Sequence, residues 1–324
     1  MFRHFVDLFD LTPQTASDLL DQAICLKRDA VEGRRPAYLA GRTLGLLFEK
    51  PSLRTRVSFE AAMAQLGGHA VFLPGKDVGL GVRETVADFS RVMSQYVDAL
   101  AVRTFAQETV DEIARHATIP VINALSDSAH PCQAMADLLT MLENFGTLDG
   151  LKLAFVGDGN NVARSLALAC ALFGVKFVLA CPPAYDFPPD FKTRYHEAFP
   201  GANLTVEHDP AIAVKNADAV YTDVWASMGQ EAEAEARRAV FAPYQVTQSL
   251  MDRAHSEAIF LHCLPAHRGE EVTDEVLDSP RSLVISQAGN RLHFQKALLL
   301  WLLEDKVIGV TPKSVILPKL RKHV

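Results

Sequence analysis

The chain has few cysteines and no excess of positive charge. Its five cysteines, at positions 25, 132, 170, 181 and 263, form no CxxC pair. An odd number of scattered cysteines is typical of reduced thiols in a cytosolic protein, so no disulfide framework is expected. The formal net charge of −7 argues against a nucleic-acid or anionic-membrane surface, because either would need a basic stripe. Positive charge with a functional role must therefore be local.

Long apolar runs and targeting segments are also missing. The most apolar stretch, residues 166–182, is broken by Gly174 and Lys176 and falls short of a membrane span, so it predicts a buried helix, a turn and a buried strand. The N-terminus mixes acidic with apolar residues and has no small-residue cleavage site, unlike a signal peptide. We see no solenoid repeat and no low-complexity segment. These features predict a cytoplasmic protein.

What the chain does contain is a regular alternation of apolar runs with helical patterns. At about 150 residues per domain, a chain of 324 residues predicts two domains. In the first half we expect strands at 43–48, 70–73, 99–102 and 119–125, and helices at 54–66, 84–96, 107–117 and 131–144. In the second half we expect strands at 151–156, 176–181, 204–207, 218–222, 258–263 and 282–286. This rhythm predicts an α/β fold of two domains, each a parallel sheet flanked by helices, joined by interdomain helices.

The linker between the domains is predicted from its glycines. Residues 144–150, "NFGTLDG", carry two glycines between a leucine-rich helix and a new strand. We therefore expect a first domain over residues 1–146, completed by a C-terminal helix at 291–305. The second domain is expected over 147–290, and residues 306–324 form a basic C-terminal tail.

The turn after the first predicted strand concentrates cationic and hydroxyl side chains. Ligands of open α/β sheets bind beyond the carboxyl ends of the strands, so such turns hold the candidate site residues. Ser52 suits a helix N-cap, and Arg54 and Thr55 follow it at the end of the helix that already carries partial positive charge. A bound anion would resolve this conflict. The alternative, equally good on this stretch alone, is a solvated turn whose arginines pair with Glu49 and Glu60.

Later turns add to this set. Arg103 follows the third predicted strand, and Gln133 lies in the "HPCQ" motif after the fourth. Pro131 suits the first helical position, so His130 is expected at the positive end of a helix, where a neutral imidazole is favoured as a hydrogen-bond donor. Taken alone, His130 is more simply a structural histidine, but its neighbours favour a site. Arg291 is expected at the start of the last helix, unless a surface carboxylate pairs with it.

The "GDGNN" motif at 157–161 allows two interpretations. A glycine-rich turn between a strand and a helix is typical of dinucleotide binding, but the third glycine of that fingerprint would fall at Val162. No ribose-binding acid follows the next strand. We therefore prefer Asn160 or Asn161 as a polar side chain in the cleft, with a nucleotide-dependent oxidoreductase as the minor alternative.

Two further strand ends carry chemistry. Asp223 is placed to pair with a substrate ammonium, although an aspartate that caps the following turn is common. His262, Cys263 and His267 raise the question of a metal site. Adjacent residues on a strand point to opposite faces, so we expect no metal there and a lone Cys263 thiol facing the cleft.

Five motifs in order resemble those of the carbamoyltransferases, and most closely the ornithine-specific members of that family. They are "SLRTR", "HPCQ", "GDGNN", "DVWASMGQE" and "HCLPAHRGEE". Each is weak alone, but together, in a resemblance that runs from Phe48 to Leu298, they are specific. The "SMG" loop and Cys263 are not expected in aspartate-specific members. Two positions depart from the family's pattern: Leu53 replaces a common threonine, and Gly79 replaces a Gln or His lent to a neighbouring subunit.

The resemblance implies an activity and a set of site residues. The activity is transfer of the carbamoyl group of carbamoyl phosphate to the δ-amine of L-ornithine, giving L-citrulline and phosphate in arginine biosynthesis or catabolism. Residues implied for carbamoyl phosphate are Ser52, Leu53, Arg54, Thr55, Arg103, His130, Gln133, Cys263, Leu264 and Arg291. Those implied for ornithine are Asn161, Asp223, Ser227 and Met228. Arg54, His130 and Cys263 are the implied catalytic residues.

The resemblance also implies a homotrimer or a multiple of trimers, and a reaction that needs no metal or organic cofactor. Two alternatives remain open at this point. The acceptor could be another amine, such as an acylated ornithine, or the chain could be a non-catalytic ligand-binding relative.

Overall fold

The computed structural model describes residues 3–226 and 231–304. Ser227, Met228 and the expected tail at 306–324 lie outside these described residues. Contacts divide the chain into two units. The first unit contains the residues up to Leu139 and the segment that begins at Asn290, and the second contains Thr140–Gly289.

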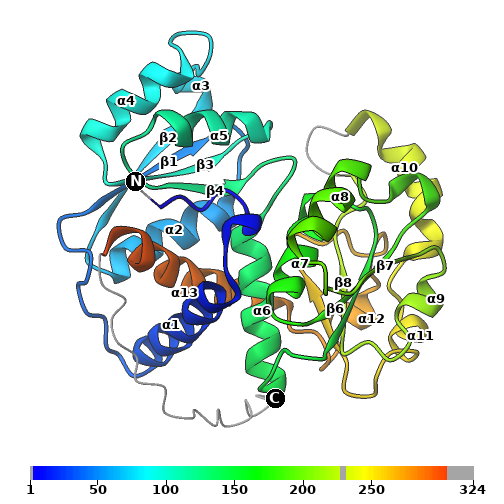
Figure 1. Ribbon diagram of the computed structural model, residues 1–324. Coiled ribbons are helices and arrows are strands. Elements are labelled where there is room, and N and C mark those ends of the chain that lie inside the picture. The colour runs from blue at the N-terminus through cyan, green and yellow to red at the C-terminus, as the bar shows by residue number, and fades with distance from the viewer. Residues whose placement is uncertain (1–2, 227–230, 305–324) are drawn as a thin grey trace. The chain divides into compact units, whose positions relative to one another are not determined.

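The first unit is built on a four-stranded parallel sheet in the order β2-β1-β3-β4. The strands are β1 (Thr43–Phe48), β2 (His69–Pro74), β3 (Ala99–Arg103) and β4 (Val121–Leu125). Parallel strands need crossover connections, which are α2 (Leu53–Gln65), α3 (Gly75–Val78) with α4 (Val86–Tyr96), and α5 (Gln107–His116). Figure 1 shows α4 and α5 on one face of this sheet and α2 on the other. Phe89 of α4 and Val110 of α5 pack on Leu100 and Val102 of the sheet.

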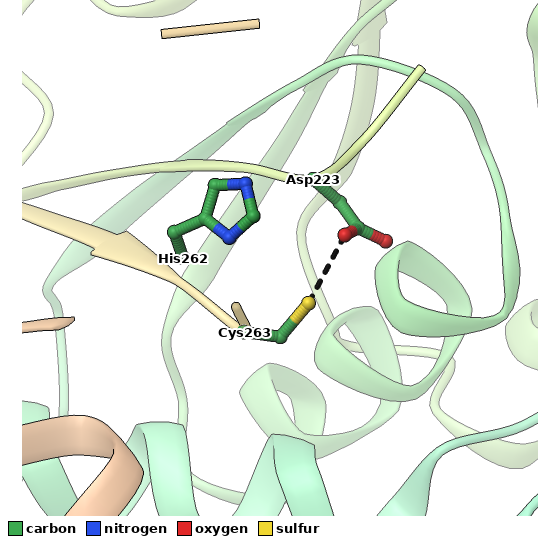
Figure 2. A group of neighbouring side chains, drawn as sticks. All are labelled: Asp223, His262 and Cys263. Carbon is green, nitrogen blue, oxygen red and sulfur yellow. Dashed lines mark hydrogen bonds between the residues drawn. The ribbon is translucent and has the colours of Figure 1, made fainter. Parts of the chain in front are cut away.

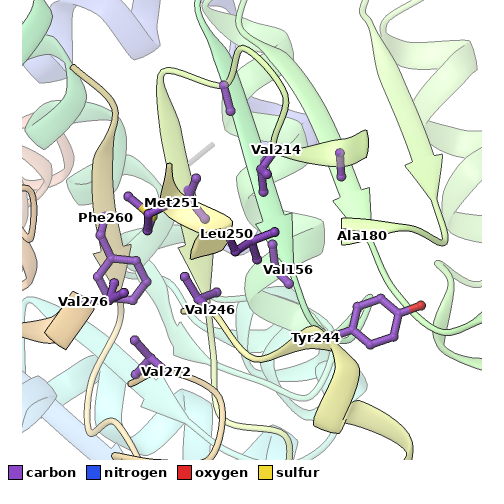
Figure 3. Packing of buried hydrophobic residues seen from close by; sticks show 14 of the residues in the cluster. Val156, Ala180, Val214, Tyr244, Val246, Leu250, Met251, Phe260, Val272 and Val276 are labelled. Carbon is purple, nitrogen blue, oxygen red and sulfur yellow. The ribbon is translucent and has the colours of Figure 1, made fainter. Parts of the chain in front are cut away.

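The second unit is built on a five-stranded parallel sheet in the order β7-β6-β5-β8-β9. The strands are β5 (Lys152–Val156), β6 (Lys176–Ala180), β7 (Leu204–Glu207), β8 (Ala219–Thr222) and β9 (Ile259–His262). Its helices are α7 (Asn161–Leu172), α8 (Pro189–Ala198), α9 (Pro210–Ala213), α10 (Ala234–Phe241), α11 (Gln248–Met251) and α12 (Asp274–Leu277). Figure 3 shows one buried face of this sheet, where Val156 and Phe260 meet Val246 and Leu250.

The remaining helices complete the two units. They are α1 (Pro13–Val31), α6 (Pro131–Phe145), α13 (Val284–Leu303) and the 3-10 helices η1 (Leu8–Asp10), η2 (Pro183–Tyr185), η3 (Glu231–Glu233) and η4 (Ala242–Tyr244). The division between the units falls inside α6 and α13. The expected fold class, two parallel sheets flanked by helices with helices shared between the domains, is confirmed.

Two expectations near the C-terminus are wrong. The strand predicted at 282–286 is a single bridge between Ser282 and Phe260 of β9, and α13 begins at Val284, before the expected start at Arg291. The β-branched pair Val284-Ile285 favoured a strand by local propensity. Tertiary contacts override that preference, since the Gln287 side chain on α13 accepts a hydrogen bond from the backbone N–H of His262 at 2.9 Å. Arg291 therefore lies two turns inside the helix, not at its N-terminus.

Candidate active site

The N-terminus of α2 carries the first group of predicted site residues. Ser52 is the N-cap, and its hydroxyl accepts from the Thr55 backbone N–H at 3.4 Å and donates to the Thr55 hydroxyl at 3.0 Å. Thr55 is buried, whereas Arg54 is exposed and the Leu53 side chain points largely to solvent. The cap closes the first turn around Thr55 and leaves Arg54 accessible to a ligand at the positive end of the helix.

The surface-pairing alternative for this turn holds for one arginine and not for the other. Arg56 donates to Glu60 at 2.9 Å, one helical turn away. Glu49 instead accepts from the Thr104 hydroxyl. Among the described residues, neither glutamate forms an ion pair with Arg54. Arg56 therefore forms a surface ion pair with Glu60, whereas Arg54 stays a candidate for anion binding.

Arg291 joins three helices of the first unit. Its guanidinium donates to the Thr55 hydroxyl of α2 at 2.7 Å and to the side-chain oxygen of Gln133 on α6. The Gln133 amide nitrogen in turn donates to Asp137 at 2.7 Å. These bonds form a continuous chain from Asp137 to Ser52, and they fix the amide of Gln133 with its oxygen toward the arginine. The loss of one member would leave buried polar groups unsatisfied.

His130 and Arg103 complete this group. His130 caps α6, where its carbonyl accepts from the Gln133 and Ala134 N–H groups at 3.1 and 3.2 Å, and Arg103 is the last residue of β3. Both side chains are buried. Burial, together with the positive charges of Arg291 and Arg103, holds the pKa of His130 well below its ordinary value of 6.5. The imidazole is therefore neutral, as the sequence predicted, and lies in a field that attracts anions.

Asp223 is the centre of the polar group in the second unit (Figure 2). One carboxylate oxygen accepts from the Cys263 thiol at 3.0 Å and from the Val224 N–H at 2.8 Å, and the other accepts from the Asn160 amide at 3.0 Å. Asn160 also caps α7 through its side-chain oxygen, at 3.0 Å from the Val162 and Ala163 N–H groups. Asp223 is only 7% exposed, and none of these three donors carries a positive charge. A buried carboxylate in such a setting favours a cationic ligand group.

The predicted ornithine residue Asn161 lies beside this group. It occupies the first position of α7, where its side-chain oxygen accepts from the Val162 N–H at 3.0 Å. Its neighbour Asn160, the other candidate at the sequence level, is the residue that contacts Asp223. Ser227 and Met228 lie outside the described residues, so the structure says nothing of their contacts.

The expectation that His262 and Cys263 point to opposite faces is wrong. β9 ends at His262 and Leu264 has a φ of 58°, so the chain leaves the strand geometry at Cys263. The ligand atoms of Asp223, His262 and Cys263 consequently lie within 4.8 Å of one another. The imidazole is nonetheless engaged at both nitrogens: Nδ1 accepts from the Leu264 N–H at 2.9 Å, and Nε2 faces buried Glu271 at 3.1 Å. It therefore has no free lone pair for a metal ion.

The sequence interpretation missed two buried residues. Asp137 has the i,i+4 spacing from Gln133 that makes such pairs neighbours on a helix, and that signal could have found it. Arg237, which pairs with Asp158 of the "GDGNN" loop, has no comparable signal, because the two residues are far apart in the sequence.

The buried cationic side chains of the first unit and the buried Asp223 carboxylate of the second unit are the two polar groups that the structure places at strand ends. Residues 3–143 match the family "Aspartate/ornithine carbamoyltransferase, carbamoyl-P binding domain", and residues 149–302 match "Aspartate/ornithine carbamoyltransferase, Asp/Orn binding domain". The chain belongs to the aspartate/ornithine carbamoyltransferase family.

Individual relatives agree over nearly the whole chain. An ornithine carbamoyltransferase of Anoxybacillus flavithermus is 53% identical over 93% of this chain and 96% of the relative. The "Ornithine carbamoyltransferase, anabolic" of Pyrococcus furiosus is 50% identical over 92% of this chain and 95% of its own length. A solved structure of the Pyrococcus furiosus ornithine carbamoyltransferase superposes with a TM-score of 0.91 at 48% identity, covering 94% of this chain and 98% of that one.

The lowered pKa of His130 predicts an acid-sensitive contribution to stability. Below pH 6.5 the unfolded chain binds a proton at this position that the folded chain excludes. The free energy of unfolding therefore decreases as the pH is lowered, by up to about 1.4 kcal/mol per pH unit for one proton. We expect His130→Asn to remove this loss, so that the stability difference between wild type and variant changes as the pH falls from 7 to 5. Urea unfolding followed by circular dichroism measures it. If the free energy of unfolding changed with pH in the same way in both proteins, His130 would have an ordinary pKa in the folded chain.

Proposed function

We propose that this chain is an ornithine carbamoyltransferase, which transfers the carbamoyl group of carbamoyl phosphate to the δ-amine of L-ornithine and forms L-citrulline and phosphate. The observation that carries the proposal is the buried Asp223 carboxylate, whose bonded neighbours are an amide, a thiol and a backbone N–H. The α-ammonium of ornithine supplies the missing positive charge. Aspartate would instead bring two carboxylates toward a carboxylate.

The first unit binds carbamoyl phosphate in this proposal. The backbone N–H groups at the start of α2, with Ser52, Thr55 and the arginines Arg54, Arg103 and Arg291, provide charge-assisted donors for the phosphate oxygens. Leu53 contributes its backbone N–H, since its side chain is 76% exposed. Arg54, Thr55 and His130 polarise the carbamoyl carbonyl, on which negative charge grows in the transition state. Gln133 offers its side-chain amide to the carbamoyl group.

The second unit binds ornithine. Asp223 pairs with the α-ammonium and Asn161 helps to hold the amino acid, and Ser227 and Met228 are assigned to the same task from the family motif alone. The neutral δ-amine attacks the carbonyl carbon, the bond from that carbon to the phosphate oxygen breaks, and the amine proton leaves with phosphate. Cys263 and Leu264 are proposed to line the place where the substrates react. Positioning and electrostatics suffice for this chemistry, so no metal or organic cofactor is required.

The relatives and the composition support one direction and one setting for the reaction. The Pyrococcus furiosus relative is named anabolic, which supports citrulline formation in arginine biosynthesis. All five cysteines lie in the described residues and none forms a disulfide, which fits a reducing cytoplasm. Within residues 3–226 and 231–304, no helix has the length and apolarity to cross a membrane.

We further propose a homotrimer or a multiple of trimers. Exposed apolar side chains lie on α2 and on the edge strand β2, where Leu53, Val57 and Val71 are 76, 51 and 46% exposed. An apolar surface beside an unpaired strand edge favours association. We expect light scattering to give the mass of three chains or a multiple of three, and Val57→Glu to reduce it. A wild-type mass of one chain would contradict the proposal.

The loop after β2 bears on the same assembly. Gly79 has a φ of 62°, and a Cβ there would lie 2.8 Å from the Cγ and Cδ atoms of Arg83. Arg83 also donates to the Asp77 carbonyl at 2.8 Å. The aliphatic part of Arg83 thus fills the space of a side chain at position 79. This supports the proposal that Arg83, together with Lys76, reaches the adjacent subunit in place of the Gln or His of other family members.

The choice of acceptor tests the proposed activity directly. We expect kcat/KM for L-ornithine to exceed that for L-aspartate, N-acetylornithine and putrescine, because only ornithine joins a free α-ammonium to a δ-amine. The measurement is ureido product formed from carbamoyl phosphate and each amine. A higher value for putrescine or N-acetylornithine would assign another acceptor, and no product with any amine would favour a non-catalytic relative.

The role of Asp223 predicts a selective loss of one substrate. Asp223→Asn keeps the shape of the side chain but removes the charge that pairs with the α-ammonium, at a cost of about 1.5–3 kcal/mol for a hydrogen bond to a charged group. We expect ornithine binding to weaken by at least tenfold while the Kd for carbamoyl phosphate changes by less than twofold. Calorimetry on each ligand separately decides this. Equal weakening of both ligands would indicate general damage to the fold.

A further inference from the structure

Arg237 on α10 is a buried arginine that the proposed mechanism does not use. Its side chain is 6% exposed. The guanidinium forms an ion pair with Asp158 and donates from Nε to the Trp225 carbonyl. The same planar group lies 4.9 Å from the ring centre of Tyr185 and 5.4 Å from that of Phe241. The planar guanidinium donates hydrogen bonds to two acceptors and contacts two aromatic rings at the same time, which the compact ammonium of a lysine cannot do.

The two hydrogen-bond partners of Arg237, Asp158 and Trp225, belong to loops that carry proposed ornithine residues, whereas the exposed Glu233 lies 4.0 Å from the guanidinium. Asp158 lies in the loop after β5, whose Asn160 caps α7 and bonds Asp223 at 3.0 Å. Trp225 lies two residues after Asp223, in the loop after β8. Arg237 is therefore bonded to the asparagine loop through Asp158 and to the aspartate loop through Trp225.

A further contact ties the aromatic partner to the same place. The Gly159 N–H donates to the Tyr185 carbonyl at 2.8 Å, so the ring against which Arg237 lies is attached to the "GDGNN" loop. Phe241 belongs to the core cluster of the second unit, and its ring centre lies 4.6 Å from that of Tyr185, so both rings lie on the same side of the guanidinium. Arg237 thus connects two loops to one rigid support.

The charge pair explains why this connection is strong. Burial raises the pKa of Asp158, and the hydrogen bond and positive charge of Arg237 oppose that rise. Removing only the arginine would leave a buried carboxylate without its partner, which is costly to the fold, whereas removing both charges avoids that penalty.

We propose that Arg237 is a positioning residue for ornithine, which holds the loop of Asn160 and Asn161 and the loop of Asp223 in the arrangement that recognises the amino acid. The inference rests on the proposed function. Arg237 touches no substrate in this account, and its effect reaches the ligand through Asp158 and Trp225.

The test compares four variants: Arg237→Met, Asp158→Asn, the double variant Arg237→Met/Asp158→Asn, and Arg238→Met as a matched control. Arg238 is the adjacent arginine of α10, but it is 54% exposed and pairs with Glu270 at 3.1 Å on the surface. The readouts are KM for ornithine, Kd for carbamoyl phosphate and the melting temperature. The double variant retains neither buried charge, so it folds even if Arg237→Met does not.

We expect KM for ornithine to rise at least tenfold in Arg237→Met and in the double variant, with Kd for carbamoyl phosphate within twofold of wild type. Arg238→Met should match wild type in both. A double variant with restored melting temperature and wild-type KM would show that Arg237 serves folding alone and would overturn the inference. The two failures are distinguishable: if the wild-type protein forms no ureido product from ornithine, the proposed function fails, whereas an active wild type with an unchanged KM in the double variant overturns only the inference.

Discussion

The structure of the first unit depends on the burial of two guanidinium groups beside a neutral imidazole. Arg103 and Arg291 are 6 and 4% exposed, and their charges help to hold the pKa of His130 well below its ordinary value. Like charges at close range destabilise a folded protein unless hydrogen bonds and a counter-charge compensate. The chain from Asp137 through Gln133 and Arg291 to Thr55 supplies the hydrogen bonds. Because they arrange the donors before a ligand arrives, an anion that binds there meets a prepared site.

The second unit shows the opposite arrangement of charge. The buried Asp223 carboxylate is held by neutral donors from three segments: Asn160 in the loop after β5, the Val224 N–H after β8 and the Cys263 thiol after β9. A carboxylate in this setting favours a cationic ligand group. One unit thus gathers buried positive charge and the other a buried negative charge. This division of charge matches the two halves of a carbamoyl transfer between carbamoyl phosphate and an amino acid. It also shows that a chain with a net charge of −7 concentrates positive charge locally.

Much of this was predictable from the sequence, and the failures have physical causes. Four strands of the first sheet and five of the second follow from apolar runs, and most candidate site residues were chosen because they come directly after a predicted strand. The start of α13 did not, because Val284 and Ile285 favour a strand locally while Gln287 is fixed by contact with His262. The proximity of the His262 and Cys263 side chains was missed because β9 ends at His262, one residue earlier than the predicted strand. Arg237 was missed because its partner Asp158 is 79 residues away.

The proposed binding site for carbamoyl phosphate depends on the hydrogen-bonded chain from Asp137 through Gln133 and Arg291 to Thr55. The most direct measurement is the melting temperature of wild type and Arg291→Met, each with and without carbamoyl phosphate, with NAD as a second ligand. A ligand at 100 times its Kd stabilises the folded state by about 2.7 kcal/mol. We expect carbamoyl phosphate to raise the melting temperature of the wild type clearly and that of Arg291→Met little or not at all, and we expect NAD to raise neither. An equal rise of the melting temperature in both proteins, or a rise with NAD alone, would contradict the proposed site.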